Sequence, residues 1–225
     1  MKTLGFSPWG NGQNIFPFDM VFDEKTNCGL DGLSKIDALV LWGGTDIHPS
    51  FYGQTHNRFS GAPTMPSDRD LWEWRAMKYC KAHGIPMIGV CRGAQFLCAF
   101  AGGKLLQHVA GHTMGDHDVM TSHGELFTVT SSHHQMLDVH GTNHELLAWS
   151  DEPLSRVYYG QEAETPAHLR EAVANKTFKE PEIVFFPDIK ALAIQGHPEW
   201  STPNSRFVSF CNEAIAEYLF AEEWA

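Results

Sequence analysis

The sequence predicts an α/β fold with a mostly parallel sheet and helices on both faces. Apolar runs of strand length alternate with amphipathic stretches of helix length, both early and late in the chain. The 225 residues are 43% hydrophobic and 19% charged, which is the composition of a globular domain. No Pro/Gly/Ser-rich linker divides them, so we expect residues 1–225 to form a single domain.

The first half of the chain carries two strand–helix units. Ser67 and Asp70 match a capping box, in which each side chain accepts a free backbone N–H group at the start of a helix. Gly84 is a typical residue at a helix end. The predicted elements are, in order, a buried strand, a helix, a second buried strand and a second helix: residues 36–42, 67–84, 85–90 and 92–100.

The second half is less regular. Alternating polar and apolar residues over 125–130 predict a strand, and two apolar runs on either side of Pro187-Asp188 predict a hairpin-like strand pair. Thr202 and Pro203 suit the N-cap and the first residue of a last helix. The runs of the hairpin are residues 182–186 and 191–195.

Charge and cysteine content exclude several classes of function. Sixteen Lys+Arg against 27 Asp+Glu give a net charge of −11, which disfavours binding to nucleic acids and to anionic membrane surfaces. No apolar run is long enough to span a membrane, and the first residues do not resemble a signal peptide. The five cysteines are scattered without CxxC spacing, so we expect a reduced, cytoplasmic protein without a disulfide framework.

Cys91 has the surroundings of a catalytic nucleophile. It lies between a predicted strand and a predicted helix, and Gly89 and Gly93 flank it, as in a nucleophile elbow where only small neighbours fit. The partial positive charge at a helix N-terminus stabilises a thiolate, so we expect a pKa below that of a free thiol. The alternative is a buried structural cysteine, which is our interpretation of Cys80, Cys98 and Cys211.

A candidate base follows the last predicted strand. His197 comes directly after the end of that strand, and Glu199 is near enough to orient its imidazole ring. Both His197 and Cys91 then lie at the carboxyl ends of strands, where open α/β sheets place their sites. Gly43 and Gly44 follow another strand, and the backbone N–H groups of Gly44 and Arg92 could form an oxyanion hole. Taken alone, the glycine pair is better interpreted as an ordinary tight turn.

Six short motifs together resemble one family, the class I glutamine amidotransferase superfamily, and most closely its γ-glutamyl-γ-aminobutyrate hydrolase-like (peptidase C26) branch. They span residues 36 to 200 and occur in this order: Gly43-Gly44-x-Asp46-x-x-Pro49, Arg69-Asp70, Gly89-x-Cys91-Arg92-Gly93-x-Gln95, Gly102-Gly103-x-Leu105-x-Gln107, Ser132-His133-His134-Gln135 and Gln195-x-His197-Pro198-Glu199.

The resemblance implies a flavodoxin-like three-layer fold and hydrolysis of a γ-glutamyl amide through a glutamyl thioester. Cys91 would be the nucleophile, His197 the general base and then acid, and Glu199 the residue that orients it. The oxyanion hole would come from Gly44 and Arg92. The implied substrate-binding residues are Gly43, Gln95, Ser132, His133 and His134.

Three interpretations stay open. The protein acts alone on glutamine or a small γ-glutamyl-amine, or it delivers ammonia to a separate synthetase subunit, or it is a non-catalytic binding member of the same fold. The chain has no nucleotide-binding fingerprint, so a synthetase would be another polypeptide. The chemistry needs no cofactor, because a thiol, a base and an oxyanion hole complete it. The oligomeric state is open, with a homodimer as one option.

Histidine is concentrated in the middle of the chain. Imidazole and carboxylate groups bind zinc and iron, so a metal site is one interpretation of this region. The spacing fits no known metal motif, and we therefore assign no metal and expect solvated loop and pocket-lining histidines. The residues concerned are His108, His112, His117, His123, His133, His134, His140 and His144, with Asp116 and Asp118 among them.

Overall fold

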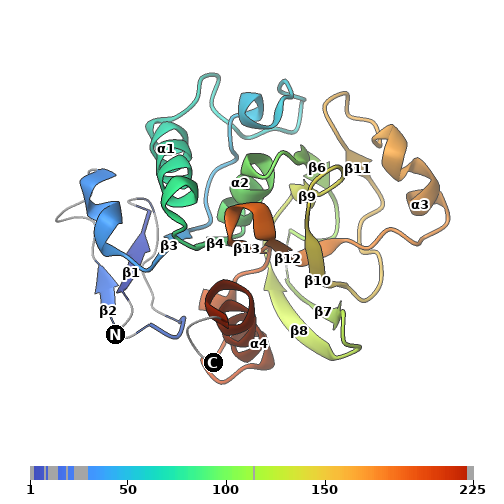
Figure 1. Cartoon of the computed structure of the whole chain (residues 1–225). Helices are drawn as coiled ribbons and strands as arrows, with labels where there is room; N and C mark the ends of the chain where they lie inside the picture. The colour runs from blue at the N-terminus through green and yellow to red at the C-terminus, as the bar shows by residue number, and fades with distance from the viewer. Residues whose placement is uncertain are drawn as a thin grey trace.

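The computed structural model describes residues 3–7, 9, 15–18, 20–22, 30–113 and 115–221. Its centre is a nine-stranded sheet (Figure 1). The strands follow in the spatial order β2 (Met20–Phe22), β1 (Thr3–Phe6), β3 (Ala38–Leu41), β4 (Met87–Val90), β13 (Ala191–Ile194), β12 (Pro181–Phe186), β10 (Glu145–Ser150), β7 (Gly115–Thr121) and β8 (Leu126–Ser131).

Smaller elements complete the described part of the chain. Two two-stranded sheets pair β6 (His108–Val109) with β11 (Tyr158–Tyr159) and β5 (Lys104–Leu106) with β9 (Met136–Asp138). The α-helices are α1 (Asp68–His83), α2 (Arg92–Phe100), α3 (Arg170–Ala174) and α4 (Arg206–Ala214). No described helix is both long and apolar enough to cross a bilayer.

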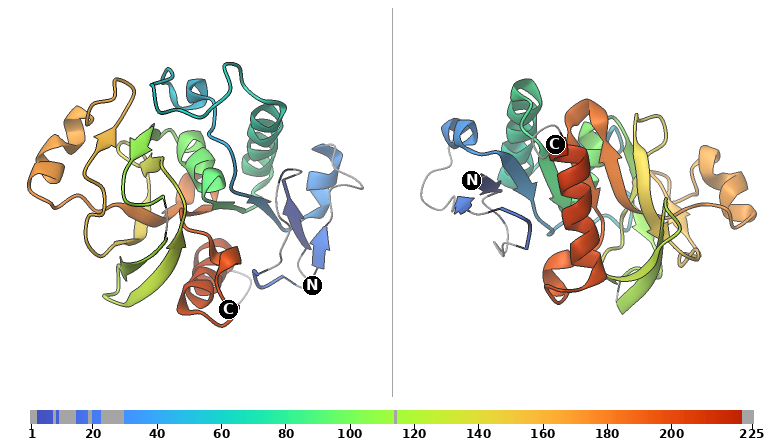
Figure 2. Two further views of the ribbon diagram at one scale, coloured as in Figure 1. Left: turned by 180° about the vertical axis from the view of Figure 1, so that it is seen from behind. Right: turned by 60° about the horizontal axis from the view of Figure 1, so that its bottom comes forward.

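The predicted fold class is confirmed. Strands β2, β1, β3, β4 and β13 pair in parallel, and the sheet continues through antiparallel pairs in which β12 and β7 alone are reversed. Helices α1 and α2 pack on one face and α4 on the other (Figure 2), with a separate apolar cluster under each face. That the whole chain forms one domain stays a prediction.

Helix α1 starts and ends as its sequence predicts. The Ser67 hydroxyl accepts the N–H of Asp70, and the Asp70 carboxylate accepts the N–H of Ser67 at 2.9 Å. Gly84 closes the helix with φ 68°, a conformation that glycine adopts without strain. The predicted hairpin is also present: β12 and β13 pair antiparallel through a short 3₁₀ turn at Pro187–Ile189.

The predicted start of the last helix is wrong. Thr202 is not its N-cap, because residues 202–205 form a turn in which the N–H of Ser205 donates to the carbonyl of Thr202 at 2.9 Å. Ser205 takes the capping role, and its hydroxyl accepts the N–H of Val208. The helix α4 therefore begins at Arg206, and it continues as a π-helical segment at Ile215–Leu219. A second residue with a capping hydroxyl, three positions along, outweighs the Thr-Pro signal.

The turn between β4 and α2 leaves no room for side chains at positions 89 and 93. A Cβ on Gly93 would lie 2.0 Å from the carbonyl oxygen of Leu41 on the neighbouring strand, and one on Gly89 would lie 2.5 Å from the backbone of Gly93. The start of α2 therefore packs directly against the sheet backbone. The glycines are required by this close approach, which fixes the position of Cys91 between them.

Gly93→Ala is therefore expected to lower the free energy of unfolding by about 3 kcal/mol, since the added methyl group meets an immovable carbonyl. Gly141→Ala is the control, because Gly141 lies on an open turn with φ 82° and nothing within 4 Å of the added atom. It should cost about 1 kcal/mol through backbone conformation alone. Urea unfolding of both variants gives the comparison, and equal losses would contradict the packing explanation.

Candidate active site

Cys91 has the backbone conformation of a nucleophile elbow. It is the N-cap residue of α2, directly after β4, with φ 51° and ψ −107°. A positive φ is strained for a residue with a Cβ, and such strain is typical of functional sites. The backbone N–H of Arg92 donates to the Cys91 thiol. The turn thus places the sulfur against the N-terminus of a helix, as the sequence predicts.

His197 and Glu199 form a pair at the end of β13. Glu199 Oε1 lies 2.8 Å from His197 Nδ1, and both side chains are less than a tenth exposed. A carboxylate only accepts, so Nδ1 carries the proton and Nε2 is left as the basic nitrogen. The indole of Trp200 stacks on the imidazole with ring centroids 3.6 Å apart and an interplanar angle of 2°. The imidazole ring of His197 is therefore held at its edge by Glu199 and on its face by Trp200.

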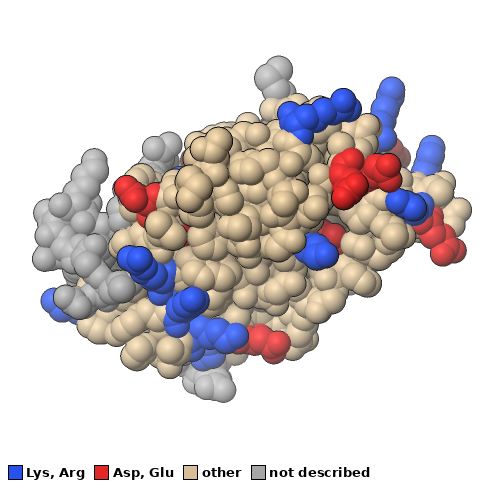
Figure 3. Space-filling view, turned by 90° about the horizontal axis from the view of Figure 1, so that it is seen from above, with Lys and Arg blue, Asp and Glu red and all other residues tan. Residues whose placement is uncertain are grey.

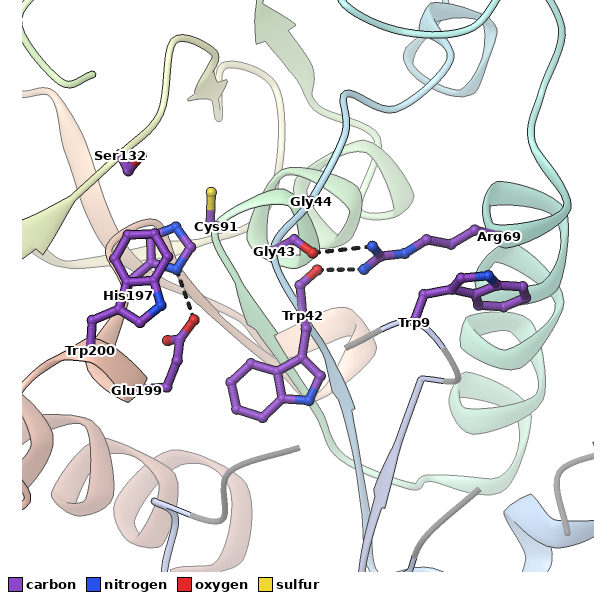
Figure 4. Close-up of a pocket in the computed structure, with 10 residues that line it drawn as sticks. All are labelled: Trp9, Trp42, Gly43, Gly44, Arg69, Cys91, Ser132, His197, Glu199 and Trp200. Carbon is purple, nitrogen blue, oxygen red and sulfur yellow. Dashed lines mark hydrogen bonds and ion pairs between the residues drawn. The ribbon is translucent and has the colours of Figure 1, made fainter. Parts of the chain in front are cut away.

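The candidate triad lines one cavity of about 490 Å³. Figure 4 shows the Cys91 sulfur between the His197 ring and the Gly43–Gly44 backbone. Gly43 lies close to the side chains of both His197 and Cys91. A Cβ on Gly43 would lie 2.9 Å from His197 Cε1 and 3.5 Å from Cys91 Cβ. The lining residues are Trp9, Trp42, Gly43, Gly44, Arg69, Cys91, Ser132, His197, Glu199 and Trp200.

The thiol of Cys91 is protonated at neutral pH. Burial raises its pKa to about 12, and the negative charges of Glu199, Asp46 and Glu182 raise it as well, while the N–H of Arg92 lowers it. The expected pKa below that of a free thiol is therefore wrong for the free protein. The helix N-terminus acts in the predicted direction, but desolvation outweighs it. A thiolate at this position requires a base that takes the proton.

Arg69 holds the glycine turn in one orientation. Its guanidinium donates to the carbonyl of Trp42 at 2.7 Å and to the carbonyl of Gly43 at 3.1 Å (Figure 4). In a trans peptide the C=O and the following N–H point in opposite directions. Fixing the Gly43 carbonyl on Arg69 therefore turns the N–H of Gly44 away from Arg69, on the side where Figure 4 places Cys91.

The side chain of Arg92 is buried and structural. Its guanidinium forms ion pairs with Asp70 and Glu73 of α1 and donates from Nε to the carbonyl of Thr45 at 2.7 Å. Glu73 also accepts from Arg69 at 2.9 Å. One charged network thus joins α1, the glycine turn and the first residue after Cys91. Two carboxylates for two guanidinium groups balance the buried charge.

Three predicted substrate-binding residues lie outside the cavity lining, while Gly43 and Ser132 belong to it. Gln95 is buried and donates to the carbonyl of Gln135 at 3.0 Å. His133 lies beside the same carbonyl, and His134 Nε2 lies 3.1 Å from Asp46 Oδ1. Their contact with a substrate stays a prediction.

Sequence reasoning missed four residues of the cavity. Arg69 is part of a quoted motif, but its role depends on carbonyl groups that only the folded turn presents. Trp200 follows the His-Pro-Glu motif directly, and this position is the signal that could have found it. Trp9 and Trp42 have no such signal.

The prediction for the histidine-rich region needs a correction. His112 and His133 are 0% and 4% exposed, so these two are not solvated loop histidines. Both lie near Glu182 of β12, which sequence analysis did not single out. Their imidazoles contact each other with ring centroids 4.6 Å apart. Residues far apart in the sequence meet here through the sheet.

Comparison with known proteins agrees with this architecture. A Mycobacterium tuberculosis protein provisionally named a glutamine amidotransferase is 28% identical over 95% of this chain, and the match spans 66% of that protein. The γ-glutamyl-γ-aminobutyrate hydrolase PuuD of Escherichia coli is 27% identical over 82% of the chain and 76% of its own length.

A solved structure shares the fold. A protein of Thermoplasma acidophilum, provisionally titled a GMP synthase subunit, superposes with a TM-score of 0.58 at 18% identity, covering 99% of this chain and 98% of that one. At this identity the likeness concerns the fold alone. The peptidase C26 family model matches residues 16–199. This chain therefore belongs to the peptidase C26 family of glutamine amidotransferase-like proteins.

Proposed function

We propose that this protein hydrolyses the amide bond of γ-glutamyl amides through a thioester on Cys91. The observation that carries the proposal is the meeting of a strained cysteine elbow and a histidine–carboxylate pair in one cavity, with Nδ1 of His197 held 2.8 Å from Glu199. Cys91 is the nucleophile, His197 the base and acid, and Glu199 the positioning residue. Membership of the peptidase C26 family supports this assignment.

The first half of the reaction forms the thioester. His197 Nε2 takes the thiol proton as the sulfur attacks the amide carbon, because the thiol with its raised pKa does not ionise alone at neutral pH. The backbone N–H groups of Gly44 and Arg92 bind the oxyanion of the tetrahedral intermediate. The carbon–nitrogen bond then breaks, and the leaving amine receives the proton from His197.

The second half releases glutamate. Water gives a proton to His197 and attacks the thioester carbon, and the carbon–sulfur bond breaks. The sulfur recovers its proton from His197, so the protein returns to its starting state. Charge at Glu199 stabilises the imidazolium in both halves, because its carboxylate already accepts the Nδ1–H of the ring. His197 thus takes a proton from the Cys91 sulfur in the first half-reaction and returns a proton to it in the second.

The leaving side of the cavity is bordered by indoles. Trp9 and Trp200 are 39% and 56% exposed, and Figure 4 places them on opposite sides of Cys91. Flat apolar walls favour an amine with a carbon skeleton over ammonia. On the face seen in Figure 3, Lys and Arg side chains adjoin one another in a row at the lower left, and Asp and Glu side chains lie in separate groups. A small amine with an apolar carbon skeleton fits these indole walls.

The direct test is release of glutamate from L-glutamine and a panel of γ-glutamyl-amines by the purified protein, with Cys91→Ala as the blank. Turnover of a γ-glutamyl-amine that depends on Cys91 supports a free-standing hydrolase. Turnover of glutamine alone, with release of ammonia, favours delivery to a separate synthetase. Failure on all substrates, with a folded protein, would overturn the proposal.

Arg69 gives a second test through its hold on the glycine turn. Arg69→Met is expected to lower kcat at least tenfold with little change in KM, because the N–H of Gly44 loses its fixed direction and the oxyanion forms only during the reaction. Arg75→Met on the exposed side of α1 is the matched control and should leave kcat unchanged. A change in KM alone would contradict this role.

A further inference from the structure

Three buried side chains converge beside the candidate active site. His112 comes from the loop between β6 and β7, His133 from the connection between β8 and β9, and Glu182 from β12. They are 0%, 4% and 1% exposed. One nitrogen or oxygen atom from each lies within 4.8 Å of the other two. We call these three residues the His–His–Glu cluster.

The outer hydrogen bonds of the two rings fix which nitrogen carries a proton. His133 Nδ1 lies 2.8 Å from the carbonyl of Gln135, which can only accept, so Nδ1 carries the hydrogen. His112 Nε2 lies 2.9 Å from Oε2 of the Glu180 carboxylate. The other oxygen of this carboxylate, Oε1, accepts a hydrogen bond from the Tyr158 hydroxyl. In the neutral rings, the lone pairs are therefore on His133 Nε2 and His112 Nδ1.

Both lone pairs face the carboxylate of Glu182. Its Oε1 lies 3.4 Å from His112 Nδ1 and 3.8 Å from His133 Nε2. Neither ring nitrogen has a hydrogen-bond partner, and neither does Glu182 Oε2. The three buried atoms His112 Nδ1, His133 Nε2 and Glu182 Oε2 thus lie near one another without a hydrogen-bond donor, which is unfavourable. A cation between them removes this conflict.

We propose that the His–His–Glu cluster binds a divalent transition-metal ion, with Zn²⁺ as the best fit. Two imidazoles and a carboxylate are a zinc donor set, and a solvent molecule commonly completes it. Donors around a tetrahedral zinc ion lie roughly 3.3–3.5 Å apart, given bonds of about 2.0 Å, close to the separations found here. This assignment replaces our sequence-based expectation of no metal.

The surroundings match those of metal-binding histidines. Such rings usually donate their second N–H to a carboxylate or a backbone carbonyl, which orients them. His112 does so to Glu180 and His133 to the carbonyl of Gln135. His117 lies at the rim, with Nε2 3.1 Å from Glu182 Oε1.

The ion would tie a wall of the cavity to the sheet. The N–H of His133 donates to the carbonyl of His112 at 2.8 Å, and Ser132 of the cavity lining is the preceding residue. The backbone carbonyl of Glu182 accepts a hydrogen bond from the N–H of Gln195, and Gln195 precedes His197 by two residues. Metal binding is therefore expected to stabilise the fold, and it does not depend on the proposed hydrolysis.

The test is zinc binding to the full chain, purified without an affinity tag, stripped with a chelator and titrated with ZnCl₂. We expect one zinc per chain and a rise in Tm, since an ion that binds only the folded state stabilises it. Substitution with Co²⁺ should give the visible spectrum of a tetrahedral site without a sulfur charge-transfer band. Wild-type protein that binds no zinc and shows no rise in Tm would overturn the proposal.

Variants locate the ion. His133→Gln and Glu182→Gln should each lower zinc affinity at least tenfold, while His123→Gln, on an exposed turn, should not change it. Cys91→Ala should bind zinc as the wild type does. Zinc lost in Cys91→Ala, or retained in full by folded His133→Gln, would place the ion elsewhere and contradict the assignment. The cobalt spectrum of the wild type decides the matter if a variant fails to fold.

Discussion

Cys91→Ala is expected to abolish turnover of γ-glutamyl amides, with a loss of at least 10⁴-fold in kcat, because it removes the sulfur that forms the proposed thioester. Cys91→Ser should lose nearly as much, since a hydroxyl is a much poorer nucleophile in this position. The fold should persist in both variants, as the substituted side chain fits the same turn. Initial rates of glutamate release, measured beside circular dichroism spectra, give the result.

Cys80→Ala is the matched control for this experiment. Cys80 is buried in α1 within an apolar cluster and does not line the cavity, so its loss should reduce stability and leave the rate per folded molecule unchanged. Turnover that survives in Cys91→Ala, or that vanishes equally in Cys80→Ala, would remove Cys91 from its role. The comparison separates loss of a nucleophile from loss of packing in a cysteine-containing core.

Glu199→Gln is expected to lower kcat by about 10²–10⁴-fold and to leave KM nearly unchanged. The amide keeps the size of the side chain, but it cannot stabilise the imidazolium, and its NH₂ group favours the wrong tautomer of His197. Glu213→Gln provides the control, because that carboxylate is exposed on α4 and far from the ring. Equal kcat values in Glu199→Gln and the wild type would exclude a positioning role.

The elements that sequence reasoning located are those with a strong local cause. The capping box at Ser67 and the glycine at position 84 set the ends of α1, because each satisfies backbone groups within one turn of itself. The small residues around Cys91 predicted the elbow partly for the same reason: Gly89 is restricted by the backbone of Gly93 four residues along, although Gly93 is restricted by Leu41 of the neighbouring strand. The start of α4 was misplaced because two hydroxyl residues compete for the cap and local sequence does not rank them.

Features that depend on long-range contacts were not predictable from the sequence. His112 and Glu182 are separated by 70 residues, and only the placement of β12 within the sheet brings them together. The pKa of Cys91 was misjudged in direction for a related reason: the helix N-terminus is a local feature, whereas desolvation depends on everything packed around the sulfur. The proposed site chemistry rests on residue type, whereas the electrostatics of the site required the fold.

The ion pairs of Arg92 have a consequence for how the cavity can adapt to different ligands. They join α1 to the residue after Cys91, and Arg69 ties α1 to the glycine turn. This side of the cavity is therefore rigid, because a shift of its backbone would separate buried ion pairs. In the proposed reaction, amines of different size would then be accommodated on the opposite side, where Trp200 is more than half exposed. Because Trp200 also stacks on His197, a substitution there is expected to change the setting of the imidazole together with the substrate range.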